Sequence, residues 1–135
     1  MKVAEMYKLR EAMEEKEQLA EKIAMLECAR ISPRVAAYEG EPIHSTVKKD
    51  INAETLVKIE ELLQMYNEKL SCILDLQARF ETDAQCLLER ERRIMRRYFL
   101  DCATWEKIAS DENISWTQIM RLRKDCIARM SNVKN

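Results

Sequence analysis

The sequence predicts an all-α protein, in which a long antiparallel helical hairpin is followed by a C-terminal three-helix helix-turn-helix domain. Only one glycine and two prolines occur in 135 residues, fewer turn-forming residues than sheets and long loops normally need. Apolar side chains recur at three- and four-residue steps along most of the chain, which is the periodicity of an amphipathic helix. Serine and threonine at capping positions then divide the last third into shorter helices.

The composition excludes several kinds of protein. No apolar run approaches the ~18 residues that cross a bilayer, and the N-terminal residues lack the apolar core of a signal peptide. Five cysteines without a CxxC pair and the single histidine, His44, do not form a usual zinc set. No phosphate-binding glycine loop, nucleophile pair or carboxylate pair with a base is visible. We therefore expect a soluble, cytoplasmic protein with reduced thiols and no metal or other cofactor, which is not an enzyme.

Residues 1–82 are predicted to form the hairpin arm. In residues 3 to about 31 an apolar stripe at helical spacing comprises Met6, Leu9, Met13, Ala20, Ile23 and Leu26. From Asp50 onward a heptad seam comprises Leu56, Ile59, Leu63, Tyr66, Leu70, Ile73, Gln77 and Phe80. Pro33, Gly40 and Pro42 mark a loop between the two helices, at about residues 32–49. Because the two helices match in length, we expect them to pack antiparallel as a hairpin.

Residues 83–135 are predicted to form the three-helix domain. Thr82 and Gln85 have the spacing of a capping box, which predicts a break near residues 81–83 and a new helix after it. This helix mixes apolar residues with five arginines between residues 90 and 97. Thr104 is expected to cap a helix over residues 105–111, and Ser115 a helix from Trp116 to about Met130.

The last predicted helix is amphipathic. Its apolar side comprises Ile119, Leu122, Cys126 and Met130, and its polar side comprises Thr117, Arg121 and Lys124, flanked by Gln118 and Asp125. Before it, Ala109 is small enough for two helices to cross closely, and Asn113 tolerates the positive φ of a tight turn. A polar face that starts at a capped N-terminus suits the major groove of DNA. The helix pattern alone equally fits a three-helix cluster with a solvated polar face.

The stretch from Arg92 to Met130 reads RRIMRRYFLDCATWEKIASDENISWTQIMRLRKDCIARM. Its motif elements are Arg97-Tyr98, Thr104-Trp105-Glu106, Ile108-Ala109, Ile114-Ser115 and Ile119, followed by a basic tail. This combination resembles region 4 of the bacterial sigma-70 family, which reads the −35 promoter element. The whole chain resembles phage-encoded, sigma-region-4-like transcriptional regulators from prophages of Gram-positive bacteria, with Ile31-Ser32-Pro33 in the loop between two long helices. The resemblance covers nearly the whole chain, with specific motifs only in the last third.

Four positions depart from the pattern of the family. Asn113, which the tight turn tolerates, and Cys102 both stand where the family usually has glycine. Glu112 replaces a residue that is usually apolar and core-facing. It is expected to loosen the end of its helix or to end that helix one residue early. Trp116 replaces an often basic residue, where it can stack on a sugar or pack against a partner, and packing is the preferred interpretation.

The resemblance and the amphipathic pattern together imply a sequence-specific DNA-binding transcriptional regulator in a host bacterial cell. Thr117, Gln118 and Arg121 are expected to meet base edges of double-stranded DNA, with Ser115 at the start of the same helix. The expected phosphate contacts are Arg96, Arg97, Lys107 and Lys124. The arm is expected to mediate self-association as a homo-oligomer or to hold RNA polymerase, and no membrane contact is expected.

The charge distribution agrees with this division of roles. Residues 84–135 carry 11 Lys+Arg against 7 Asp+Glu, a net of +4, whereas residues 1–83 carry 12 against 17, a net of −5. A net of +4 is modest for nucleic-acid binding. Two alternatives therefore stay open, namely a small-terminase-like DNA packaging protein and a protein-only adaptor that docks on RNA polymerase without touching DNA.

Overall fold

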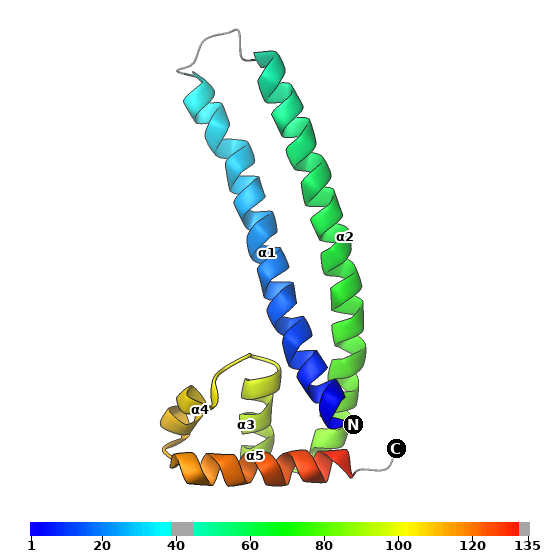
Figure 1. Ribbon diagram of the computed structural model, residues 1–135, viewed down its shortest axis with the longest axis vertical. Coiled ribbons are helices and arrows are strands. Elements are labelled where there is room, and N and C mark those ends of the chain that lie inside the picture. The colour runs from blue at the N-terminus through cyan, green and yellow to red at the C-terminus, as the bar shows by residue number, and fades with distance from the viewer. Residues whose placement is uncertain (39–44, 133–135) are drawn as a thin grey trace. The chain divides into compact units, whose positions relative to one another are not determined.

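The computed structural model describes residues 1–38 and 45–132, with side chains for residues 1–30 and 52–132. All regular secondary structure of this described part is helical and it contains no strand, which confirms the all-α prediction. Its elements are α1 (Val3–Tyr38), α2 (Ser45–Asp83), the 3-10 helix η2 (Ala84–Cys86), α3 (Glu89–Phe99), α4 (Trp105–Glu112) and α5 (Trp116–Ser131) (Figure 1). None of these helices is both long enough and apolar enough to span a membrane.

The predicted loop at residues 32–49 is too long. The first helix continues through Pro33 to Tyr38, and the second begins at Ser45, so both ends of the expected loop are helical. Ala36 and Ala37 follow the proline, and alanine has the strongest intrinsic helix propensity, which favours continuation of α1. Gly40 and Pro42 lie outside the described residues.

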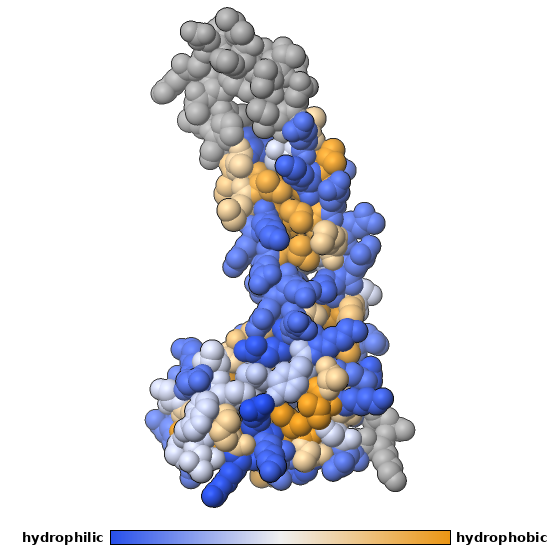
Figure 2. All heavy atoms as spheres, viewed as in Figure 1, coloured by the Kyte–Doolittle hydropathy of each residue, from blue (hydrophilic) through white to orange (hydrophobic). Residues whose placement is uncertain are grey.

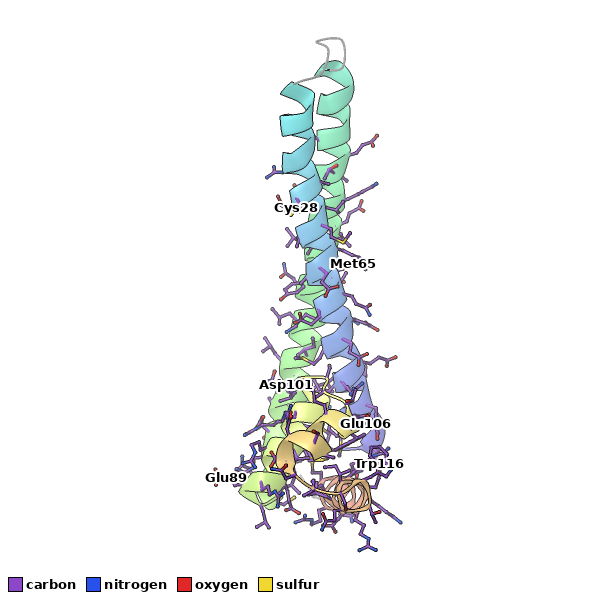
Figure 3. All side chains as sticks on the ribbon, turned by 90° about the vertical axis from the view of Figure 1, so that its left-hand side faces the viewer. Cys28, Met65, Glu89, Asp101, Glu106 and Trp116 are labelled. Carbon is purple, nitrogen blue, oxygen red and sulfur yellow. The ribbon has the colours of Figure 1, made fainter. Side chains whose placement is uncertain are left out.

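The chain divides into two compact units, which we call the base unit (Met1–Glu15 with Ser71–Asn135) and the arm unit (Lys16–Leu70). The sequence places a boundary at residue 82, whereas contacts in the folded chain group the first turns of α1 and the last turns of α2 with the C-terminal helices. In the arm unit, α1 and α2 lie side by side and run in opposite directions (Figures 1 and 3).

The base unit holds a continuous hydrophobic core. Its fully buried apolar side chains come from every helix and include Met6, Leu9, Ile73, Phe80, Ile94, Met95, Phe99, Ile108, Ile119 and Met130. Phe99 lies at its centre, with its ring centroid 5.4 Å from Tyr7 and 5.8 Å from Phe80. Tyr98 stacks on the buried ring system of Trp105 at 4.1 Å between centroids. The short helices α3, α4 and α5 are therefore held by packing rather than by their own length.

The predicted capping box at Thr82 and Gln85 is wrong. The Thr82 hydroxyl donates to the carbonyl of Ala78 at 2.9 Å, and the Gln85 amide donates to the carbonyl of Glu81 at 3.2 Å. Both side chains therefore turn back onto carbonyls of the last turns of α2 and do not cap the first turn of a new helix. The next helix begins later, at Glu89, where the Glu91 carboxylate accepts from the Leu88 N–H at 2.9 Å.

Candidate nucleic-acid interface

The capping predictions for α4 and α5 are confirmed. The Thr104 hydroxyl accepts from the Lys107 N–H at 3.2 Å and so begins α4. At α5 the Ser115 hydroxyl accepts from the Gln118 N–H at 3.2 Å, and the Gln118 side chain accepts from the Ser115 N–H at 3.1 Å. These two reciprocal hydrogen bonds form a capping box, which fixes the residue at which α5 begins.

Two turns use the left-handed backbone conformation without glycine. Asn113 has φ 56° and ψ 44°, and the chain closes behind it as the Ile114 N–H donates to the Ala109 carbonyl at 3.0 Å. Asparagine is the residue best able to replace glycine there, as predicted. Cys102 also has a positive φ, 58°, so the residue that replaces a common glycine keeps a glycine-like conformation.

The predicted two faces of α5 are observed. Ile119, Cys126 and Met130 are fully buried, and Leu122 is half-buried. Thr117, Arg121 and Lys124 are exposed on the opposite side, with Gln118 and Asp125 exposed beside them. Ala109 of α4 is buried, as expected for a small residue between crossing helices. The capped start of α5 thus presents a polar, basic surface to solvent, while its other side completes the core.

Most other basic side chains of the base unit are held by acidic groups. Arg96, an expected phosphate contact, donates two hydrogen bonds to the Glu81 carboxylate. Arg97, another, donates to Asp111 at 2.8 Å. Of the basic side chains on α4 and α5 that the structure describes, those without an ion pair or hydrogen bond are Lys107, Arg121 and Lys124. The five basic residues expected to contact DNA therefore fall into two groups. Lys107, Arg121 and Lys124 are free, whereas Arg96 and Arg97 are paired with carboxylates.

Glu112 does not loosen the end of α4, and the helix does not end before it. Its carboxylate accepts from Arg93 at 3.0 and 2.9 Å, and Arg90 lies 3.7 Å away. This two-point contact replaces the apolar packing expected at the position, since paired arginine and carboxylate groups satisfy each other. The helix consequently runs through Glu112 to the cap at Asn113.

Arg10 is a structural residue that the sequence analysis missed. Its guanidinium donates to the carbonyl of Tyr98 in the last turn of α3 at 3.1 Å, and to those of Cys102 at 3.3 Å and Ala103 at 3.4 Å after that helix. The same group lies 4.2 Å from the centroid of the Tyr98 ring, a cation–π contact. An arginine on a distant helix carries no local sequence signal for such a role.

Trp116 is 51% exposed, although tryptophan usually buries most of its ring system. Figure 3 labels it at the end of α5 that faces the viewer, where the helix is seen end on. About half of this side chain therefore stays open among the described residues, and the position expected to pack against a partner remains accessible to one.

Two of the ion pairs predict a pH dependence of stability. Hydrogen bonds from Arg96 hold the pKa of Glu81 below its ordinary value of 4.5, and those from Arg93 do the same for Glu112. A carboxyl with a lowered folded pKa stabilises the protein above its unfolded pKa and loses this contribution as pH falls through the folded pKa. We expect the Glu81→Gln, Glu112→Gln double variant to be less stable than the parent at pH 6, and this difference to shrink below about pH 4.5. Thermal unfolding across this range measures it, and a pH-independent difference would contradict the assignment.

Comparison of the chain with known protein families, curated proteins and solved structures finds no match. Among the described residues no group of histidine, cysteine, aspartate and glutamate side chains is placed to bind a metal ion. The chemistry available at this surface is therefore that of exposed cations, hydroxyl and amide groups on α4 and α5.

Proposed function

We propose that the protein is a sequence-specific DNA-binding transcriptional regulator of phage or prophage origin. In this proposal α3–α5 form a sigma-region-4-like helix-turn-helix, and α1 and α2 form an antiparallel hairpin arm. The observation that carries the proposal is the capped N-terminal half of α5, whose exposed side bears Thr117 and the free cations Arg121 and Lys124. A helix of this kind presents its first turns to base edges in the major groove.

The exposed side chains divide into readers and holders. Arg121 can donate two hydrogen bonds to a guanine edge, and Thr117 can contact bases beside it. Gln118 uses its side-chain oxygen in the cap with Ser115, which leaves its amide hydrogens as donors for DNA. Lys107 and Lys124 are placed as phosphate contacts, which position the protein without reading sequence. Arg96 and Arg97 could contact phosphates only if their ion pairs with Glu81 and Asp111 were broken.

The salt dependence of binding tests how many cations reach DNA. Each phosphate neutralised on duplex DNA contributes a slope of about −0.9 to a plot of log affinity against log salt. With Lys107 and Lys124 as the free phosphate contacts, we expect a slope of about −2 for each bound chain. Fluorescence-anisotropy titrations of one duplex at several salt concentrations measure this slope.

Matched variants separate free from paired cations in the same assay. Lys107→Gln should bring the slope about one unit closer to zero. Arg97→Gln should leave it nearly unchanged, because Asp111 already neutralises that guanidinium. A flat salt response of the parent protein would favour the protein-only adaptor instead.

The exposed Trp116 favours a protein partner in addition to DNA. An accessible tryptophan at the edge of a basic surface is typical of protein–protein interface anchors. RNA polymerase is the partner that we propose for this ring, and the arm serves self-association. A particle of eight or more chains in solution would instead favour the small-terminase-like packaging protein.

A further inference from the structure

The arm unit has a thin hydrophobic core. Of its side chains that the structure describes, the buried ones are Leu19 and Ile59. Large apolar side chains stay exposed there, namely Met25, Leu56, Val57, Leu63 and Met65. Figure 2 shows hydrophobic side chains on the visible face of this unit. Two paired helices with so little burial are marginal, because the stability of helices in proteins comes mainly from packing.

The exposure follows one edge of the heptad seam of α2. The Ile59 position is covered, and Tyr66, one heptad later, is half-buried. Leu56 and Leu63, at the alternate heptad position, are 42% and 43% exposed. At ~100° per residue, Leu56, Leu63 and Leu70 fall within an arc of about 40°. Leu70 is half-buried. We call these three leucines, with Glu60 and Asn67 between them, the open edge.

The open edge is complementary to itself. If two copies of α2 run antiparallel with Leu63 at the two-fold axis, Leu56 of each copy lies level with Leu70 of the other. Glu60 then lies within about one residue's rise, ~1.5 Å, of Asn67 of the second copy. An asparagine amide can donate to a carboxylate, and no two like charges meet. A two-fold interface requires this kind of self-complementary patch.

We infer that the open edge of α2 pairs with the open edge of a second copy of this chain, antiparallel, with Leu63 beside the two-fold axis. This inference deepens the self-association proposed above for the arm and rests on it. Val57 and Met65 lie on other sides of α2, about 100° and 180° from Leu56, and are outside this interface.

The first test is the mass of the full chain in solution. Sedimentation equilibrium at tens of micromolar protein should give twice the 16.0 kDa of one chain. Leu63→Lys places two ammonium groups face to face at the axis and should raise the dimer dissociation constant at least about tenfold. Val57→Lys, on another exposed side of the helix, is the matched control and should leave the mass unchanged.

Cross-linking tests the register in which the two copies of α2 pair. It does not depend on Leu63→Lys, whose effect on mass could also come from a loss of helix. In a chain whose exposed Cys28, Cys72 and Cys86 are replaced by serine, Leu63→Cys should join two copies through a short bifunctional maleimide. Val57→Cys should not, because it faces away from the second copy.

The mass measurement and the cross-linking test this inference without testing the proposed function, because neither measurement uses DNA. A single-chain mass overturns the two-fold pairing while leaving DNA binding to be judged by titration. Larger assemblies, or cross-linking through Val57 rather than Leu63, overturn the pairing as well. A cross-linked dimer that binds no DNA supports the interface and contradicts the regulator.

Discussion

Replacing Phe99 with alanine is expected to lower the free energy of unfolding of the base unit by about 3–5 kcal/mol. Phe99 is fully buried and contacts the rings of Tyr7, Tyr98 and Phe80, which come from α1, α3 and α2. Removal of its ring loses the burial of apolar surface and leaves a cavity. The surrounding helices can relax into this cavity only in part, because the core is closely packed. Urea unfolding followed by tryptophan fluorescence measures the loss, since Trp105 is buried in the same core.

The control for Phe99 is Leu88→Ala, about three helical turns before it. Leu88 is 71% exposed, so its truncation should change the unfolding free energy by less than about 0.5 kcal/mol. Equal effects of the two substitutions would mean that the aromatic cluster does not organise the base unit.

Arg121→Ala is expected to weaken binding to a preferred DNA site by about 1–3 kcal/mol, with little loss on random DNA. Its guanidinium is exposed on α5 and has no acidic partner, so it is free to form two hydrogen bonds with a guanine. Truncation removes no core contact, and the variant should keep the parent's unfolding free energy. Titration against a selected duplex and a scrambled duplex at equal salt gives both affinities.

Lys107→Ala provides the comparison for Arg121→Ala. A phosphate contact carries no sequence information, so this variant should weaken both duplexes about equally. Equal losses on both duplexes for Arg121→Ala would reduce Arg121 to a phosphate contact. If neither variant changes either affinity, the exposed side of α5 is a solvated surface and the proposed function is wrong.

Local rules predicted the C-terminal helices well. The caps at Thr104 and Ser115 and the positive φ at Asn113 depend on residues within four positions of each other, which the sequence displays directly. The two faces of α5 follow in the same way from helical periodicity. Thr82 shows the limit of such rules, because its hydroxyl could serve either the end of one helix or the start of the next.

Long-range contacts could not be read from the sequence. Arg96 and Arg97 look like free cations there, yet Glu81 and Asp111 lie 15 and 14 residues from them along the chain. Arg10 binds carbonyls 88 to 93 residues away. Pairings of this kind depend on the folded arrangement of helices, which hydrophobic periodicity alone leaves open.

The base unit is built from two stretches of chain separated by the whole arm unit, and this has a consequence for synthesis. As the ribosome releases the chain, Met6 and Leu9 emerge more than eighty residues before Phe99 and Ile108, the core residues that they join. The first turns of α1 therefore carry an uncovered apolar face until Phe99 and Ile108 have been translated, since distant contacts form only after the intervening chain exists. A chaperone that recognises short apolar helices should hold stalled chains ending near residue 90 and release full-length ones. A proteolytic cut within the arm would leave two fragments that the core still holds together.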